Sequence, residues 1–238
     1  ITMRFYIDTK DLNAGISTVI KALSSRTTIG ILEGVYLSAK EDGIHLKCTD
    51  LSLQIETLIA ATIEEEGTIV LPGRIFYEMV KRLPGETTEI HTEGNTTYIN
   101  SGRAKTTLQG MEAADYPDMP KFGFNQSFEI GQVALKNLIR QSIFAIAQDD
   151  TKPILTGVLM QVDGPNLSLV ALDGYRLAIT KTHLESTCDM IKAVIPGKSL
   201  AEVIRILSDD EESKVNITLS KTHMVLDMDY TQIITLLL

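Results

Sequence analysis

Apolar residues recur along the chain with two periods, one typical of helices and one typical of strands. Residues 10–25, 73–82, 132–147 and 198–208 carry apolar side chains at helical spacing. Short apolar runs bounded by turn residues such as Asp42-Gly43 predict strands. In the first half of the chain these runs lie at 3–8, 32–39, 44–49, 53–60, 68–71, 88–91, 97–100 and 104–108. The predicted order is strand, helix and three strands, given twice.

The pattern repeats at a fixed distance along the chain. When residue 7 is placed over residue 130, ten of the 29 positions from 7 to 35 are identical, whereas about two matches are expected by chance at ordinary composition. The same offset places Asp50 over Asp173, and an offset one residue longer superposes the Pro-Gly pairs at 72–73 and 196–197. We interpret this pattern as an internal duplication.

The duplication predicts an α+β fold of two pseudo-symmetric domains, residues 1–122 and 123–238. Each domain is expected to contain two strand–helix–three-strand units, with helices covering one face of antiparallel sheets. The segment 112–127, which contains Pro117 and Pro120, is expected to be the linker between the domains.

The charge distribution changes what the net charge implies. A net charge of −9 argues against a nucleic-acid binder, which ordinarily has a basic surface. However, the four predicted helices carry nine basic and only three acidic residues, so the acidic excess lies elsewhere. Lys136 and Arg140 lie four residues apart, which places them on one helix face. The positive charge is therefore predicted to gather on the helices. These helix faces are either ordinary solvated surfaces or, if all four helices point the same way as the internal symmetry predicts, one shared basic surface.

Motifs for catalysis, phosphate binding or metal binding are absent from the sequence. It contains no phosphate-binding loop, no dinucleotide fingerprint and no nucleophile elbow, and the four histidines lack metal-ligand spacing. The acidic runs 64–66 and 209–212 are expected to be solvated loops. Two cysteines 140 residues apart offer no disulfide framework, which fits a reducing cytoplasm. We expect no cofactor, no metal and no membrane span.

The sharpest local signal is the segment 172–178. Asp173-Gly174 favours a tight turn with positive φ, which would place Tyr175 and Arg176 at a loop edge. Tyr and Arg are frequent in binding hot spots, although a plain hairpin turn would have the same sequence. Two other interpretations stay open on these residues: an enzyme that uses Asp173 and Arg176 on a duplicated scaffold, and a ligand-binding or structural repeat protein without a role at DNA.

Several short motifs together resemble the bacterial replicative sliding clamp family, the β subunit of DNA polymerase III. The resemblance covers essentially the whole chain and rests on residues 25–28 (SRTT), 71–74 (LPGR), 101–103 (SGR), 113–117 (AADYP) and 173–178 (DGYRLA). It implies a non-catalytic ring that closes around duplex DNA without reading sequence and tethers the polymerase. In such a ring, helices line the hole and sheets lie outside.

The resemblance also implies which residues face DNA. Arg26 and Arg74 match arginines near DNA in the family, and Gln148 neighbours Asp149, where the family often has glutamine. An aspartate would repel phosphate, so Gln148 is expected to take over that contact. The complete expected set is Arg26, Arg74, Lys136, Arg140, Gln148 and Lys198.

A second implied site is a groove for linear peptides from polymerases and the clamp loader. The wall that the second domain contributes matches Leu155, Leu172, Gly174, Tyr175, Arg176 and Leu177. Apolar Leu155 and Leu177 are expected to receive hydrophobic anchors of the peptide. Leu172 and Tyr175 replace the threonine and histidine common in the family, so a different peptide preference is expected.

The family chains carry a third domain and form a two-chain ring. This sequence stops at residue 238 within the apolar run 233–238, so we expect the stop to fall inside a strand, with about 120 further residues missing. Ile75, Met79, Thr106 and Leu108 match the first-domain side of the subunit interface. The 238-residue chain alone is expected not to close the two-chain ring.

Overall fold

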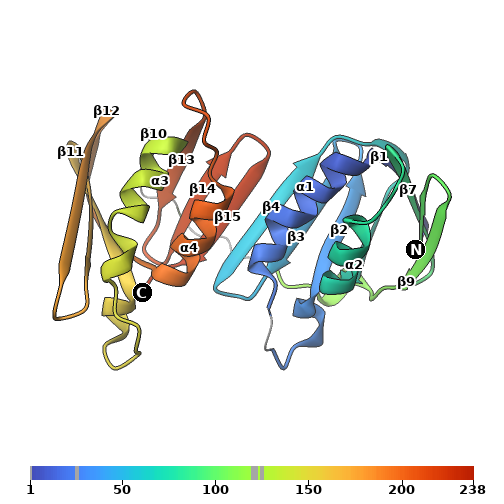
Figure 1. Cartoon of the computed structure of the whole chain (residues 1–238), viewed down its shortest axis with the longest axis horizontal. Coiled ribbons are helices and arrows are strands. Elements are labelled where there is room, and N and C mark those ends of the chain that lie inside the picture. The colour runs from blue at the N-terminus through green and yellow to red at the C-terminus, as the bar shows by residue number, and fades with distance from the viewer. Residues whose placement is uncertain (1, 25–26, 119–122, 124–125) are drawn as a thin grey trace. The chain divides into compact units, whose positions relative to one another are not determined.

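The computed structural model describes residues 2–24, 27–118, 123 and 126–238 (Figure 1). The chain divides into two compact units, Ile1–Met119 (unit 1) and Pro120–Leu238 (unit 2). Both units combine antiparallel strands with short helices, which confirms the α+β prediction.

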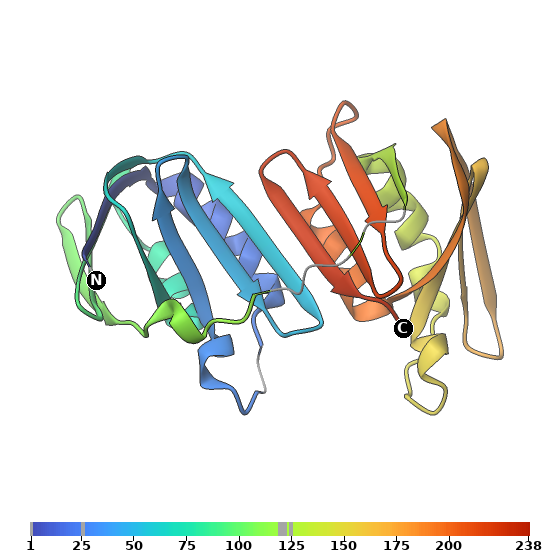
Figure 2. The same ribbon diagram turned by 180° about the vertical axis from the view of Figure 1, so that it is seen from behind.

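Unit 1 is built from two helices that lie against antiparallel sheets (Figures 1 and 2). Its sheets have the strand orders β5-β1-β7-β8-β9 and β4-β3-β2-β6. The elements are β1 (Thr2–Asp8), α1 (Thr9–Val19), β2 (Gly34–Lys40), β3 (Gly43–Thr49), β4 (Leu53–Ile59), β5 (Thr62–Glu65), β6 (Gly67–Pro72), α2 (Gly73–Val80), β7 (Thr87–Glu93), β8 (Thr96–Ser101) and β9 (Ala104–Gln109).

Unit 2 repeats the design with fewer and longer strands in its first half. One sheet has the order β10-β13-β14-β15, and β11 pairs with β12. The elements are β10 (Gln126–Gly131), α3 (Gln132–Arg140), β11 (Gly157–Leu172), β12 (Leu177–Pro196), α4 (Gly197–Ile206), β13 (Lys214–Leu219), β14 (His223–Met228) and β15 (Thr231–Leu236). Two 3-10 turns, η4 (Ile143–Ala145) and η5 (Pro153–Thr156), lie between α3 and β11.

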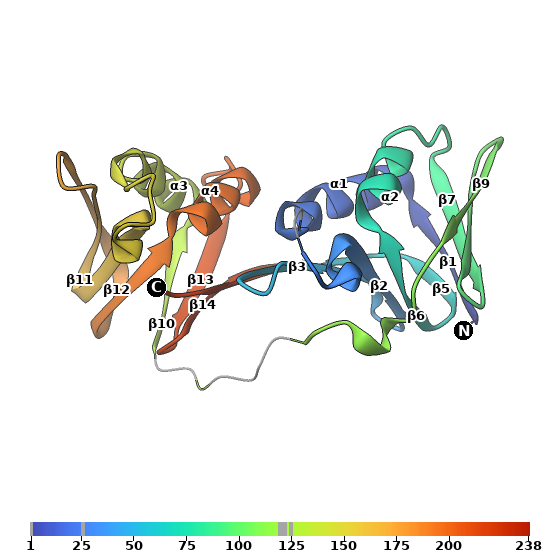
Figure 3. The same ribbon diagram turned by 90° about the horizontal axis from the view of Figure 1, so that it is seen from below.

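Each helix is short and is held by its apolar face. In α1, Leu12, Ile16 and Val19 are fully buried, in agreement with the helical spacing in the sequence. The Asp8 carboxylate caps this helix by accepting a hydrogen bond from the Lys10 backbone N–H at 2.8 Å. Isolated helices of this length are marginal in water, so tertiary packing supplies most of their stability. Figure 3 shows the helices of each unit on one side of its sheets.

The repeated Pro-Gly pairs start α2 and α4 at places where the backbone is crowded. A Cβ on Gly73 would lie 3.0 Å from the Glu33 carbonyl oxygen, and one on Gly197 would lie 2.9 Å from the Thr156 carbonyl oxygen. A side chain at Gly73 would therefore force the 3-10 turn η2 (Gly30–Glu33) to move, and one at Gly197 would force η5 to move. Both halves of the duplication thus need glycine at the start of this helix, because a side chain would not fit there.

Three expectations from the sequence need correction. Glu64 and Glu65 lie in β5, an edge strand paired with β1, and not in a loop; charges on an edge strand discourage pairing with other chains. The first half of unit 2 contains two long strands instead of three, and their register shifts around Gly164. The last strand, β15, ends at Leu236 and does not run to residue 238.

The helices also end earlier than predicted. The spacing predicted a helix over 132–147, but α3 stops at Arg140 and a separate 3-10 turn follows. Within the described residues, no helix is both long and apolar enough to span a membrane.

Candidate functional site

The turn between β11 and β12 is organised by the Asp173 carboxylate. Its Oδ1 accepts hydrogen bonds from the backbone N–H groups of Tyr175 at 2.9 Å and Arg176 at 3.0 Å, and its Oδ2 accepts one from Arg176 Nε at 2.9 Å. These backbone donors, with the guanidinium behind them, hold the pKa of Asp173 below its usual value. Gly174 takes a φ of 94°, as the Asp-Gly signal predicted.

An exposed apolar patch lies beside this turn. Leu172 pairs directly with Leu177 across the hairpin, and Ile179 follows on the same face two residues later. These three side chains, which we call the apolar patch, are 38%, 60% and 53% exposed, and Tyr175 is fully exposed. Contiguous exposed apolar groups next to fixed polar ones are typical of interaction sites.

Arg176 connects the turn to the segment after α3. Its guanidinium lies 5.8 Å from the centroid of the Phe144 ring, within the range of a cation–π interaction. The half-buried Leu155 follows in η5, where its carbonyl oxygen accepts a hydrogen bond from the Ala147 backbone N–H at 2.8 Å. The turn thus contacts the segment after α3 through Phe144, and Leu155 is tied to the end of the same segment by the Ala147 backbone.

Sequence reasoning missed Phe144, Ile154 and Ile179 as surface residues. All three are more than half exposed. Phe144 fell inside the predicted helix 132–147, where an apolar residue is expected to be buried. Because α3 stops at Arg140, Phe144 instead lies in η4 and faces Arg176. The alternation of β12 offered a signal for Ile179, since Ala178 and Thr180 on either side are buried.

The helix cations differ in how accessible they are. Arg74 in the first turn of α2, Arg140 in the last turn of α3 and Lys198 in the first turn of α4 are all exposed, as is Gln148 after η4. Arg26 lies outside the described residues.

Lys136 does not fit the predicted exposed basic face. Its side chain is 8% exposed, and its Nζ donates hydrogen bonds to Asp209 Oδ1 at 2.7 Å and to the Leu207 carbonyl oxygen at 3.0 Å. The ammonium holds the pKa of Asp209 below its ordinary value. Lys136 therefore joins α3 to the end of α4 and is not a free cation. Of the two basic residues expected on the exposed face of α3, only Arg140 lies there.

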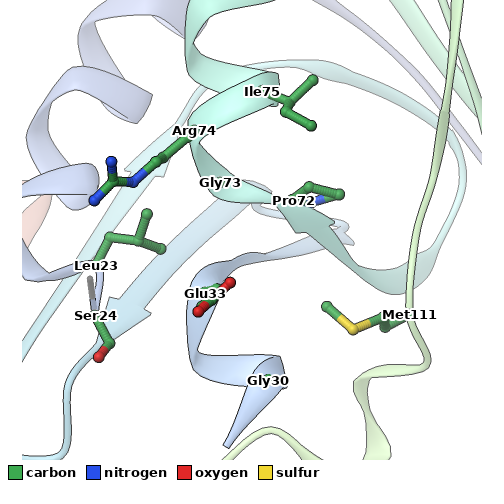
Figure 4. A pocket seen from close by; sticks show the side chains of 9 residues that line it. All are labelled: Leu23, Ser24, Gly30, Glu33, Pro72, Gly73, Arg74, Ile75 and Met111. Atoms are coloured by element: carbon green, nitrogen blue, oxygen red, sulfur yellow. The ribbon is translucent and has the colours of Figure 1, made fainter. Parts of the chain in front are cut away.

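A cavity of about 580 Å³ opens at the start of α2 (Figure 4). Arg74 and Ile75, expected at DNA and at a subunit interface respectively, both line it. Among the described residues, the rest of the lining is Leu23, Ser24, Gly30, Pro72, Gly73 and Met111, with one carboxylate, Glu33. Arg74, predicted to face DNA, and Ile75, predicted to face another subunit, thus line the same cavity of unit 1.

The four residues expected at the subunit interface lie on two elements of unit 1. Ile75 and Met79 lie on α2, where Ile75 is 58% exposed. Thr106 and Leu108 lie on β9, which is the last strand of its sheet. Leu108 is buried at 9% exposure, so its side chain contributes mainly to the core of unit 1. An edge strand nevertheless has unpaired backbone groups available for another strand.

The turn offers little support for an enzyme that uses Asp173 and Arg176 as catalytic residues. The hydrogen bonds that the described residues give to the Asp173 carboxylate come from its own hairpin, so this carboxylate organises the turn. Among the described residues, no group of three His, Cys, Asp or Glu side chains is placed to hold a metal ion.

Comparison with known families identifies the chain. The model of the N-terminal domain of the DNA polymerase III beta subunit matches residues 3–120, and that of the central domain matches residues 129–238. The chain belongs to the DNA polymerase III beta subunit family. Each matched domain lies almost wholly within one unit of the structure, so both halves of the duplication carry the family pattern.

Curated relatives in the DNA polymerase III beta subunit family are longer than this chain. The beta sliding clamp of Bacillus subtilis is 40% identical over 233 residues, which is 94% of this chain and 61% of the relative. That of Halalkalibacterium halodurans is 37% identical over 222 residues, or 88% of this chain and 58% of the relative. The chain therefore spans about three fifths of the clamps that it matches.

Solved structures of the family share the fold. The sliding clamp of Bacillus subtilis superposes with a TM-score of 0.95 at 38% identity, covering 100% of this chain and 65% of that one. A clamp from Pseudomonas aeruginosa, crystallised with griselimycin, gives a TM-score of 0.93 at 28% identity, covering 100% and 65%. The predicted clamp fold is confirmed.

Proposed function

We propose that the chain supplies two clamp domains, residues 1–122 and 123–238, of a bacterial processivity factor. In its full-length form this factor is a two-chain ring in the cytoplasm that encircles duplex DNA and tethers the polymerase without catalysing a reaction. The observation that carries the proposal is the match of both units to the family. Exposed cations on the helices support it, since a sliding ring needs positive charge near phosphates but no contact with base edges.

Arg26, Arg74, Arg140, Gln148 and Lys198 are the proposed DNA-facing residues. Lys136 leaves this set because Asp209 neutralises its charge. Contacts to phosphate carry no sequence information and weaken with salt, so encirclement and not affinity would retain the ring.

The ring proposal is tested with the full gene product loaded on nicked circular DNA by its clamp loader. The protein should stay on circular DNA at high salt and be lost when the DNA is linearised, because only topology holds it. Equal retention on both forms would contradict encirclement. Arg140→Glu should speed the loss from linear DNA, with Glu129→Lys, at an exposed position of β10, as the charge-changing control.

The turn and the apolar patch are the proposed peptide site for polymerase and clamp-loader subunits. Leu155, Leu172 and Leu177 would receive apolar anchors, and Gly174, Tyr175 and Arg176 would form the rim. Exposed Tyr and Arg around apolar pockets are the usual composition of hot spots. That a related clamp was crystallised with griselimycin supports a ligand site on this fold.

The peptide proposal is tested with short peptides from the polymerase and clamp-loader subunits of the same organism. Fluorescence anisotropy with the full gene product should detect binding, and Leu177→Asp should weaken it at least tenfold because a charge would enter an apolar site. The matched control is Lys181→Asp, an exposed residue four positions further along β12. Equal effects of the two substitutions would contradict this placement of the site.

For the subunit interface, we propose that Ile75, Met79, Thr106 and Leu108 contact a second copy in the full-length ring. The free edge of β9 and the exposed Ile75 support this. Ile75→Asp in the full gene product should shift the species seen in sedimentation from dimer to monomer, whereas an unchanged dimer would contradict the assignment.

A further inference from the structure

Unit 1 contains another cavity beside its two helices. In unit 1, a cavity of about 380 Å³ lies between the first turns of α1 and the loop that follows α2. It is lined by Asp8, Thr9, Lys10, Asn13, Val80, Lys81, Leu83, Pro84, Gly85 and Glu86.

One residue that lines this cavity, Asn13, carries an acceptor without a partner. Asn13 Oδ1 is buried and makes no hydrogen bond. Leaving a buried acceptor unsatisfied ordinarily costs about 1–3 kcal/mol, so such atoms usually indicate a ligand, an ion or a water.

The duplication shows what fills the equivalent space in unit 2. Asn13 corresponds to Lys136 at the offset that superposes α1 on α3, and Leu83 corresponds to Leu207 at the offset that superposes α2 on α4. In unit 2, the Lys136 ammonium donates hydrogen bonds to the Leu207 carbonyl oxygen and to Asp209. The position that holds a buried ammonium in unit 2 is therefore occupied by a shorter amide in unit 1.

The lining of the unit 1 cavity fits the same chemistry. The carboxylates of Asp8 and Glu86 and the orphan Asn13 oxygen supply negative charge and an acceptor, while Val80 and Leu83 offer an apolar wall for an alkyl stem. Of the two lysines in the lining, Lys81 is already paired with Glu78 at 3.2 Å and lies over the Tyr77 ring. Lys10, on the exposed rim, remains the competing positive charge.

We propose that this cavity binds a primary alkylammonium group, the counterpart of the Lys136 side chain in unit 2. Asn13 Oδ1 and the Leu83 carbonyl oxygen, the counterpart of the Leu207 carbonyl oxygen, would accept its N–H bonds, and the alkyl stem would lie along Val80 and Leu83. The group can come from a free amine or from a lysine side chain of another protein. This inference does not depend on the proposed clamp function.

The test is a titration of the 15N-labelled 238-residue chain followed by NMR of the Asn13 side-chain amide. Butylammonium should shift this resonance to saturation, whereas tetramethylammonium, which has no N–H donor, should not. No saturable shift, or the same shift with both cations, would overturn the proposal. Two further probes separate the sources: cadaverine represents a free amine, and Nα-acetyl-lysine methylamide represents a lysine side chain of a protein. The probe that binds at least tenfold more tightly than butylammonium identifies the source.

Substitutions give an independent readout. Asn13→Lys should fill the cavity as Lys136 does, weaken butylammonium binding at least tenfold and raise the melting temperature. Asn137→Lys, on an exposed position of α3, adds the same charge outside the cavity and should change neither quantity. If Asn13→Lys binds butylammonium as well as the unsubstituted chain does, the cavity is not the site.

Discussion

The same turn occurs in both units, but the two units expose different parts of it. In unit 1, Asp50 Oδ1 accepts hydrogen bonds from the backbone N–H groups of Ser52 at 2.9 Å and Leu53 at 2.7 Å. In unit 2, Asp173 makes the equivalent pair of bonds at 2.9 and 3.0 Å. The duplication has therefore kept the backbone and its aspartate.

The two turns differ in the residues that this shared backbone carries. After the aspartate, unit 1 has Leu-Ser-Leu-Gln at 51–54, and unit 2 has Gly-Tyr-Arg-Leu at 174–177. Leu53 and Gln54 are buried, whereas residues 174–177 are all exposed. The comparison shows that the same hydrogen-bonded turn can carry side chains that are partly buried in one unit and fully displayed in the other.

The largest expected effect is the loss of peptide affinity when Tyr175 is replaced by alanine, compared with the same replacement of Ser52. These two residues occupy the same position in the two turns. Tyr175→Ala should weaken peptide binding about tenfold, or about 1.4 kcal/mol, without changing stability, because its side chain is fully exposed. Ser52→Ala should change neither the peptide affinity nor the stability. Anisotropy titration and thermal unfolding of both variants check this. Equal affinities would mean that the turn of unit 2 is as inert as that of unit 1.

The second prediction exchanges the residue at positive φ. Leu51 has a φ of 74°, and Gly174 has a φ of 94°. A left-handed conformation costs a residue with a side chain about 1–2 kcal/mol, so Gly174→Leu should lower the free energy of unfolding by about 1 kcal/mol. Leu51→Gly should raise it by less, because glycine also gains freedom in the unfolded chain. Urea unfolding measures both, and a change in the same direction for the two variants would contradict the strain argument.

Much of the fold could be predicted because the relevant signals are local or repeated. The helical spacing of Leu12, Ile16 and Val19 predicted their burial, and all three are buried. The Pro-Gly pairs lie where the backbone is too crowded for a side chain, and the Asp-Gly turn places its glycine at positive φ. The duplication then allowed the second half to be interpreted from the first. Family resemblance, and not any single motif, pointed to the peptide site.

What could not be predicted depends on contacts between distant residues. The sequence places Lys136 four residues from Arg140 but does not show that Asp209, 73 residues away, reaches its ammonium. Phe144 continues an apolar pattern, and only the end of α3 at Arg140 turns it toward Arg176. Strand length in unit 2 likewise depends on pairing between β11 and β12, which local propensity does not encode.

The third prediction separates the two cations of α3. Each phosphate contact steepens the dependence of log affinity on log salt by about 0.9. In the full gene product, Arg140→Ala should therefore lower the slope for linear duplex DNA by about 1, and Lys136→Met should leave it unchanged because that charge is already paired. Binding measured from low to moderate salt checks this. A reduced slope for Lys136→Met would show that its ammonium leaves Asp209 for phosphate.

The smallest expected effect is the pH dependence of the turn in unit 2. Because the folded state lowers the pKa of Asp173, its ionised form stabilises the turn at any pH above the unfolded value of about 3.9. That contribution is lost as the pH falls through the lower folded pKa. The stability difference between the unsubstituted chain and Asp173→Asn should therefore be constant from pH 7 to 5 and shrink toward pH 3. Urea unfolding at these pH values measures it, and a difference that does not change with pH would show that the neutral amide serves the turn as well as the carboxylate does.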